Sequence, residues 1–533
     1  MKNKKVIIIL SSLIVLIGGI LFVNRIYNKF KNKQIPKKNN LAIMVKGESG
    51  EYESSDAIPK GNYVLNGEKT ICENNGKVLN YDSTSGKISF LFVGSDRCSL
   101  YFDKIIDTEK PVISNLTIND TTVIATLTDN IELSGYGIST SNTVEPTSWD
   151  SISGTSYNLS TTITTEGTYY LWVKDSSDNK TVSDAINLEK KGYQTILINN
   201  GGGATTVDAA ISYIKGKGAP SFNTVATTNE GMYAADDDYT ATTGMKSYYF
   251  RGAVNNNWVK FGKDSSNKVM YWRIIRINGD GSIRMIYSGT TAPTSSTATV
   301  MTGTGTQITI NSKNTFAFNS SYNPAHVGYM YTASAQHGNS TSSTIKTAVD
   351  NWYKTTTLET DATTKSLVAD QIFCNDRSAT TSSSGTPGEI SGSMSTSTTY
   401  YYGAYVRLLT NKSPKLTCTA ASDKFTLKTS SIGNKTLDYP VGLITADEVA
   451  MAGGKSGSNN STYYLYTNQD YWLGSPYFFN SGRTYAYEFF VSSSGYLDSN
   501  YVDLTYGARP VVSLSSSVKL SGDGTYNNVY IAS

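Results

Sequence analysis

Histidine is almost absent from this chain, whose 533 residues include only His326 and His337. Histidine is the side chain that most often acts as a general acid or base near neutral pH, and it is a common metal ligand. Both histidines lie in a polar region, and the sequence has no recognisable Ser/His/Asp arrangement or glycine-rich phosphate-binding loop. This scarcity favours recognition over catalysis, so we predict no enzyme activity, no cofactor and no metal centre.

Cysteine is also scarce, with four residues, Cys72, Cys98, Cys374 and Cys418. They form no C-x-x-C motif and have no histidine nearby, which disfavours zinc. Two disulfides in an oxidising compartment fit better, one between the first two cysteines and one between the last two. Each bond would contribute roughly 3–4 kcal/mol in the chain-entropy model. Four buried free thiols are the alternative.

Basic residues are not in excess beyond the start of the chain. Residues 1–38 hold nine Lys and Arg and no Asp or Glu, which leaves 37 basic against 43 acidic residues, a net charge of −6, in the remainder. The remainder has no basic stripe, so we predict no nucleic-acid partner. Hydrophobic residues make up only 38% of the chain, and the many short β-branched runs among Ser, Thr, Asn, Gly and Tyr indicate strands.

One long segment, Val6–Val23, has no charged residue. Its eighteen residues would span roughly 27 Å as a helix, close to the hydrocarbon thickness of a bilayer. No Ala-x-Ala-like cleavage site follows, so we predict an uncleaved, single-pass anchor in the cell membrane with the bulk of the chain extracellular; a cleaved signal peptide is the alternative. Basic residues on both sides leave the orientation ambiguous, but large domains translocate largely regardless of charge, and the cysteines favour export.

Changes in composition and periodicity predict a multidomain protein with four parts. These are a membrane anchor with a basic juxtamembrane stalk (1–40), a small disulfide-linked β unit (41–107), a β-sandwich (108–190) and an α+β domain with inserted Ser/Thr-rich loops (191–533). A unit as small as the second has a thin core, for which a crosslink would compensate.

The β-sandwich is indicated by Gly167–Asp175, in which apolar and polar residues alternate. Gly167–Asn179 reads G-T-Y-x-L-x-V-x-D-x-x-D-N, and this part resembles bacterial immunoglobulin-like spacer domains, whose last strands often have that pattern. Three aspartates there are candidates to hold calcium, although Asp is also an ordinary turn residue. They are Asp129, Asp175 and Asp178.

Residues 191–533 contain three helix signals and one hairpin signal. Thr206–Lys215 and Ser343–Tyr353 place apolar residues at helical spacing, and Thr445 with Glu448 has the pattern of a capping box. Tyr271–Tyr287 contains two strand-like runs around an Asn-Gly turn, which predicts a β-hairpin.

The segment from Tyr477 to Tyr506 is composed like a binding surface. It has six Tyr, five Ser, two Asn and two Asp, and no Lys, Met, Gln or Trp. Tyr offers a large, stiff face at low entropy cost, and Ser and Asn add adaptable hydrogen bonding, as in antibody paratopes. We predict that the ligand-binding residues are Tyr477, Phe478, Asn480, Tyr485, Tyr487, Tyr496, Asp498, Asn500, Tyr501, Asp503 and Tyr506.

Short motifs surround this segment. Residues 240–530 carry Ser247–Gly252, Tyr271–Ile275, Pro440–Glu448, Tyr471–Pro476 and Gly507–Pro510. In these motifs and their order they resemble bacterial surface domains with the C-type-lectin-like fold, in the variant shared with formylglycine-generating enzymes. The last two motifs look like the W-x-x-S-P and G-x-R-P framework of that fold. The resemblance implies a structural frame made of Trp472, Gly474, Pro476, Gly507, Arg509 and Pro510.

Two roles within this frame are argued from chemistry. Trp472 is expected to pack in the core, and the Arg509 guanidinium to tie loop carbonyls together. Contact with a ligand is the alternative role for both residues.

The same frame also resembles variable proteins that are diversified by retroelements. In those proteins, adenine-specific mutagenesis leaves Tyr, Asn, Ser and Asp at exposed positions of the last sheet, and residues 477–506 match that composition. Glu488 is the exception, because an Asn codon changed at its adenines does not yield Glu. An undiversified domain with Tyr/Ser-rich loops explains the composition equally.

Three functional hypotheses follow. The first is a membrane-anchored bacterial receptor or adhesin that binds a protein or glycan ligand through the C-terminal segment. The second is a structural envelope protein that makes lateral contacts with its neighbours. The third is an extracellular enzyme on the fold of formylglycine-generating enzymes, which use reactive cysteines; here Cys374 and Cys418 are expected to pair with each other.

Overall fold

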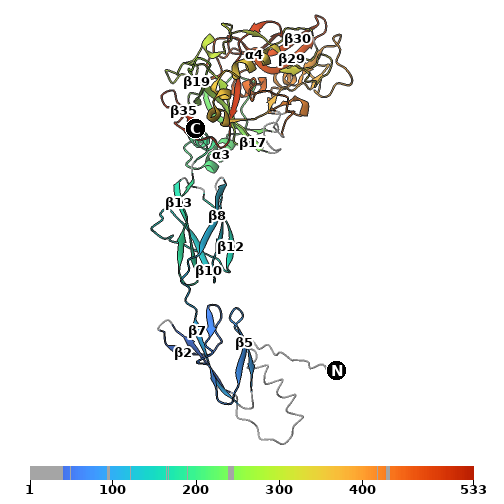
Figure 1. Cartoon of the computed structure of the whole chain (residues 1–533). Coiled ribbons are helices and arrows are strands. Elements are labelled where there is room, and N and C mark those ends of the chain that lie inside the picture. Colours follow the sequence, from blue (N-terminus) through green and yellow to red (C-terminus); the bar gives the residue numbers. More distant parts are fainter. Residues whose placement is uncertain are drawn as a thin grey trace, which may run out of the picture. The chain divides into compact units, whose positions relative to one another are not determined.

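A computed structural model of the chain describes residues 40–47, 50–92, 96–119, 122–163, 165, 167–188, 190–237, 245–323, 325–416, 418–427 and 432–533 (Figure 1). The membrane anchor predicted at Val6–Val23 lies outside these residues. Within them, no helix is both long and apolar enough to cross a membrane. The described part is mostly strand with a few short helices, and the chain forms two compact units, Met1–Glu189 and Lys190–Ser533.

The first unit begins with a small sheet around one long strand. β7 (Arg97–Lys104) pairs with β1 (Asn40–Lys46), β3 (Tyr63–Leu65) and β4 (Ile71–Cys72), and β1 also pairs with β2 (Tyr52–Ser55); β5 (Lys77–Asp82) and β6 (Lys87–Leu91) form a separate hairpin. Alternate residues of β7 are buried, and the core is small: it consists of Ile43, Ile88, Cys98, Leu100 and Phe102. Cys72 and Cys98 face each other across β4 and β7 and form the first predicted disulfide, which is confirmed.

The rest of the first unit is two sheets that share one core. One sheet has the order β12-β9-β8, made of β8 (Val112–Asn119), β9 (Thr122–Thr128) and β12 (Ser156–Thr162). The other has the order β11-β10-β13-β14, with β15 also on β13; its strands are β10 (Leu133–Ser139), β11 (Asp150–Ser151), β13 (Gly167–Asp175), β14 (Lys180–Val182) and β15 (Ile186–Leu188). Leu127 from β9 and Leu171 and Val173 from β13 are fully buried between them.

The second unit is built on a nine-stranded sheet with the order β24-β33-β20-β19-β18-β35-β34, extended by β17 on β19 and β16 on β17. The predicted hairpin is present as β19 and β20, which pair antiparallel. The strands are β16 (Asn229–Asp237), β17 (Met245–Gly252), β18 (Trp258–Lys263), β19 (Val269–Ile277), β20 (Ile283–Tyr287), β24 (Val368–Ala369), β33 (Val511–Leu514), β34 (Leu520–Ser521) and β35 (Tyr530–Ala532).

The helices of the second unit are short. They are α2 (Gly192–Asn199), α3 (Val207–Gly216), α4 (Thr344–Tyr353), α5 (Thr357–Thr360), α6 (Ala362–Ser366), α7 (Gly403–Tyr405) and α8 (Ala446–Ala452). Short 3-10 turns at Thr304–Thr306 and Ala421–Asp423 and a π turn at Val406–Thr410 complete them.

A second, five-stranded sheet has the order β26-β27-β29-β30-β31. In Figure 1, β29 and β30 lie at one side of the unit and β19 and β35 at the other. The strands of this second sheet are β26 (Ala379–Thr380), β27 (Tyr400–Tyr402), β29 (Tyr471–Asn480), β30 (Tyr485–Val491) and β31 (Leu497–Tyr501). Small two-stranded pairs join β21 (Phe316–Ala317) to β32 (Thr505–Tyr506), β22 (Met330–Tyr331) to β23 (Thr341–Ser342) and β25 (Phe373–Cys374) to β28 (Lys424–Phe425).

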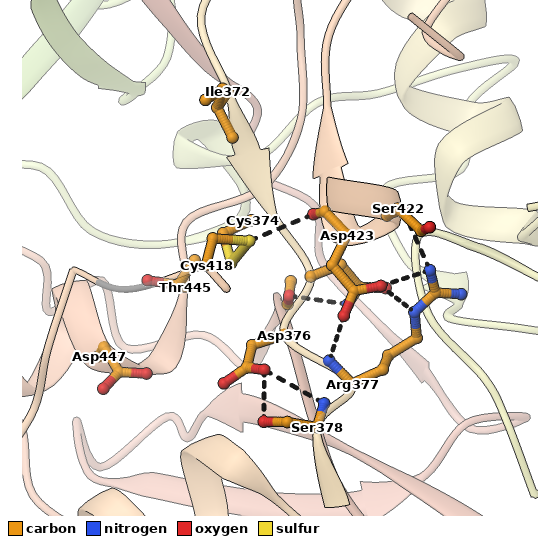
Figure 2. The surroundings of a disulfide bond; sticks show 12 residues. Ile372, Cys374, Asp376, Arg377, Ser378, Cys418, Ser422, Asp423, Thr445 and Asp447 are labelled. Carbon is orange, nitrogen blue, oxygen red and sulfur yellow. Dashed lines mark hydrogen bonds and ion pairs between the residues drawn. A yellow bond between two sulfur atoms is a disulfide. The ribbon is translucent and has the colours of Figure 1, made fainter. Parts of the chain in front are cut away.

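The second disulfide, Cys374–Cys418, is also confirmed, with Cα atoms 5.8 Å apart. Figure 2 shows Arg377 and Asp423 facing each other beside it. The Arg377 Nε donates to Asp423 Oδ1 at 2.8 Å, and the two side chains are almost fully buried. The disulfide and this ion pair together fix the loops that lead into β26 and β28.

Candidate functional site

The five-stranded sheet contains most of the predicted ligand-binding residues, and none of these residues is fully buried. Asp503 is exposed, and the side chains of the other ten are partly exposed. Four of the sheet's strands contribute an aromatic residue at the same register position. Tyr401 of β27 is opposite Phe478 of β29, Phe478 is opposite Tyr487 of β30, and Tyr487 is opposite Tyr501 of β31.

The rings of these four residues form a continuous row, which we call the aromatic ladder (Tyr401, Phe478, Tyr487 and Tyr501). Ring centroids are 6.0 Å apart between Tyr401 and Phe478, 4.4 Å between Phe478 and Tyr487, and 4.6 Å between Tyr487 and Tyr501. Aromatic pairs at such distances attract one another beyond the burial of their area. The ladder is therefore an ordered surface in which each ring is held by its neighbours.

Further rings extend the ladder at both ends. Tyr405 of α7 contacts Tyr401 and Tyr477, each with centroids 4.9 Å apart. At the other end, Tyr485 contacts Tyr501 at 4.5 Å and Tyr322 at 4.8 Å. The exposed aromatic surface thus reaches over residues far apart in the sequence.

The sequence prediction did not include Tyr322, Tyr401 and Tyr405, because they lie far from the tyrosine-rich segment 477–506. One signal was present for β27. In the run Tyr400-Tyr401-Tyr402 the outer two residues are buried and Tyr401 is partly exposed, which is the alternation of a half-buried strand. No local signal pairs this strand with β29, since that contact joins residues about eighty positions apart.

The predicted residues do not form one surface, because the sheet divides them between its two faces. Tyr487 and Tyr501 are register partners, and so are Glu488 and Asn500 one position further along. Successive residues of a strand point to opposite faces, so Asn500 lies on the face away from the ladder. The predicted residues Tyr496, Asp498, Asn500 and Tyr506 form this second group, which is linked by hydrogen bonds from Tyr496 to Asp498 and from Asn500 to Tyr506.

The phenols of the ladder have different surroundings. Arg483 donates to the Tyr501 hydroxyl at 3.1 Å, and hydrogen bonds from Tyr487 and Arg483 lower the pKa of Tyr501. Burial raises the pKa of Tyr477 to about 12. The surface therefore offers phenol hydroxyls, which can both donate and accept hydrogen bonds, with the Arg483 guanidinium beside Tyr501.

All six residues of the predicted structural frame are buried, and three of them, Trp472, Gly474 and Pro476, belong to β29 itself. Trp472 packs against Phe318 and Phe490 and donates through its Nε1 to the Phe316 carbonyl at 2.8 Å. A Cβ added at Gly507 would lie 2.0 Å from Cδ of the buried Gln307, so a larger residue there would displace that side chain. These contacts fix where β29 begins and where the chain leaves β32.

Arg509 joins the two sheets of the unit from the inside. Its Nε donates to the Tyr287 carbonyl and its Nη1 to the Leu465 carbonyl, both at 3.0 Å, and its guanidinium lies over the Tyr471 ring. With 1% of its surface exposed, it braces backbone carbonyls and has no exposed area to offer a ligand.

Glu488 is fully buried under the ladder, and both its carboxylate oxygens lack a hydrogen-bond partner among the described residues. Burial raises the pKa of Glu488 well above its usual value, and the charge of Arg377 offsets this only in part. A residue in this position cannot vary freely.

We predict that Glu488→Gln stabilises the second unit at pH 7.5 by about 1–3 kcal/mol, because the amide is neutral and isosteric. The folded-state pKa is raised, so the stabilising contribution of Glu488 is fully present below its unfolded pKa and is lost as the pH rises through the folded pKa. In urea unfolding, the free energy of unfolding of the wild type should be lower at pH 7.5 than at pH 5. This difference should be smaller in the Glu488→Gln variant. Glu359→Gln, at a partly exposed carboxylate, is the matched control. It should change neither the free energy of unfolding at pH 7.5 nor its difference between the two pH values. A destabilised Glu488→Gln protein would mean that the carboxylate is ionised and paired.

The cysteines and histidines of the chain lie outside the aromatic ladder. All four cysteines of the chain are in disulfides. His326 is fully buried, and burial lowers its pKa to about 4. His337 Nδ1 lies 3.0 Å from Asp423 Oδ2, a carboxylate that already binds Arg377.

Comparisons of this chain with protein-family models, with curated proteins and with solved structures found no match.

Proposed function

We propose that this protein is a membrane-anchored bacterial cell-surface receptor or adhesin whose C-terminal unit binds a protein or glycan ligand through the aromatic ladder. The single observation that carries the proposal is that four partly exposed aromatic rings stand in register across four strands. Contiguous apolar surface rimmed by polar groups marks interaction sites. Stiff aromatic faces beside phenol hydroxyls and Arg483 suit a glycan or a protein surface.

The finer fold and the cellular location belong to this proposal. The buried W-x-x-S-P and G-x-R-P residues support a C-type-lectin-like fold for 191–533, and the two sheets around one core support an immunoglobulin-like spacer at 108–190. Two disulfides support an oxidising compartment. The uncharged segment Val6–Val23 supports a membrane anchor.

Diversification of the C-terminal segment remains part of the proposal. The alternation of buried frame and exposed ladder supports it, because exposed substitutions usually change stability little whereas buried ones change it strongly. The genomic test is a near-copy of the codons for residues 470–510, differing at adenines, beside a reverse transcriptase. Allelic differences spread evenly over buried and exposed positions would contradict diversification.

The binding test replaces two neighbouring rings of the ladder, Tyr487→Ser together with Tyr501→Ser. We expect wild-type protein to bind at least one probe on a printed glycan array or on intact cells, and the double variant to bind it at least about 30-fold more weakly, since central aromatic residues dominate binding energy. The melting temperature should stay within a few degrees. Tyr526→Ser is the matched control, because Tyr526 is an exposed tyrosine of the loop between β34 and β35, and it should bind like the wild type.

Two outcomes would contradict the proposal. The first is undiminished binding by the double variant. The second is self-association of the wild type through the ladder without binding to any array or cell surface, which would instead identify an envelope protein with lateral contacts.

A further inference from the structure

Three aspartates of the first unit converge, although they come from distant parts of the sequence. Asp107 lies between β7 and β8, Asp129 directly follows β9, and Asp175 is the last residue of β13. One carboxylate oxygen from each residue lies within 4.8 Å of the others. The cluster therefore joins the segment before β8 to both sheets that follow it.

Hydrogen bonds from the protein hold the three carboxylates in place, but not every carboxylate oxygen accepts one. Asp107 and Asp175 are 5% and 1% exposed. Each Oδ1 accepts hydrogen bonds from nearby amides: that of Asp129 from Ile131 and Glu132, and that of Asp175 from Ser177 and Asn179.

The second oxygens of two of these residues have no partner. The Oδ2 atoms of Asp107 and Asp129 are buried and accept no hydrogen bond from the described residues. A buried carboxylate oxygen without a donor is costly, since its lost hydration is not replaced. Two such atoms within the same cluster point to a ligand that supplies positive charge.

Nothing in the described protein supplies that charge at close range. No Lys or Arg among the described residues lies within 4.0 Å of any of the three carboxylates in an ion pair, so three like charges share one site. Asp178, which the sequence had suggested as a calcium ligand, is not part of the cluster. It is exposed, and its carboxylate lies 3.0 Å from Lys180 Nζ. The third carboxylate is supplied by Asp107 instead.

We propose that Asp107, Asp129 and Asp175 bind one calcium ion. Oxygen donors alone, with carboxylates dominating, are the ligand set of hard divalent cations, and an irregular arrangement completed by carbonyls or water suits Ca²⁺ better than the strictly octahedral Mg²⁺. The ion would tie the segment around Asp107 to β9 and β13. The site is independent of the ladder and of the function proposed for it.

The test uses the purified full chain in detergent, with CaCl₂ alone as the probe. Isothermal titration calorimetry should give one site, with a dissociation constant of about 0.1–1 mM or tighter, the range of extracellular modules. Against EGTA, 10 mM CaCl₂ should raise the melting temperature of the first unit by at least about 4 °C. Equal melting with CaCl₂ and EGTA, and no binding heat, would overturn the proposal.

Charge-removing variants separate an ion site from a purely structural cluster. Asp107→Asn and Asp129→Asn keep an acceptor oxygen and the side-chain volume, so each should weaken calcium binding at least about 10-fold. In EGTA both variants should melt at the same temperature as the wild type or higher, because one of three like charges is gone. Asp178→Asn is the matched control and should keep the calcium response. Destabilisation of both Asn variants in EGTA, with an unchanged calcium response, would assign the cluster to structure alone.

Discussion

Replacing Glu448 with Ala is expected to lower the free energy of unfolding of the second unit by about 3–5 kcal/mol, the usual cost of removing one partner from a buried ion pair. Glu448 belongs to α8 and has no exposed side-chain surface. Its Oε1 lies 2.9 Å from Arg276 Nε and 2.7 Å from Arg284 Nε, and both arginines are fully buried in β19 and β20. Without the carboxylate, the two buried guanidiniums lose the acidic group that they share, although Arg276 Nη1 keeps its ion pair with Asp237 Oδ2 at 3.1 Å.

The same residue also stabilises the start of α8. Its Oε2 accepts from the Thr445 amide at 3.0 Å, and the Thr445 hydroxyl accepts from the Glu448 amide, so the two residues form a complete capping box. Urea unfolding at pH 7.5 measures the loss. Glu359→Ala removes a partly exposed carboxylate paired with Lys365, and as the control it should cost less than about 1 kcal/mol. Equal effects of the two substitutions would show that the buried network contributes little.

The pH dependence of this network has the opposite sign to that of Glu488. Burial acts to raise the pKa of Glu448, but Arg284 and Arg276 outweigh it and the net pKa is lowered. A depressed folded-state pKa means that the contribution of Glu448 is present above its unfolded pKa of about 4.5 and is lost as the pH falls through the folded pKa. The pKa values of the two buried glutamates are therefore shifted in opposite directions, that of Glu448 downward and that of Glu488 upward. The reason is that only Glu448 has arginines at ion-pair distance.

Three of the helices, α3, α4 and α8, were predictable because their signals are local. α3 begins after the N-cap Thr206 and α4 after the N-cap Ser343, whose hydroxyl accepts from the Lys346 amide at 3.2 Å. Caps and helical spacing act over a few residues, so the sequence contains them completely. The β19–β20 hairpin belongs to the same class, since its turn joins adjacent strands.

The candidate site was predictable in composition but not in arrangement. Tyrosine content identified residues 477–506, yet the inward position of Glu488 and the separation of Asn500 from Tyr501 depend on the register between strands. A shift of one residue would exchange the two faces, and composition does not encode that register. Tyr401 belongs to the ladder only because β27 pairs with β29. The same limit applies to the cluster of Asp107, Asp129 and Asp175, because Asp107 joins it only through tertiary packing.

Removing the Cys72–Cys98 disulfide by Cys72→Ala with Cys98→Ala should unfold the small sheet around β7 while the rest of the chain stays folded. The two cysteines are 26 residues apart, and closing such a loop contributes roughly 3–4 kcal/mol in the chain-entropy model. The sheet has a core of only five buried residues, so its stability is small and a loss of this size removes most of it.

The matched control is the other disulfide, removed by Cys374→Ala with Cys418→Ala. It closes a longer loop, since the cysteines are 44 positions apart in the sequence, so its loss is predicted to cost about as much or slightly more. The second unit has a far larger core and should remain folded at 25 °C with a lowered melting temperature. Hydrogen exchange followed by mass spectrometry should therefore show full loss of protection in residues 50–104 of the first variant and no such loss in the second. Retained protection in residues 50–104 would mean that five buried side chains are enough to hold this sheet, and that the disulfide only adds to a fold already stable without it.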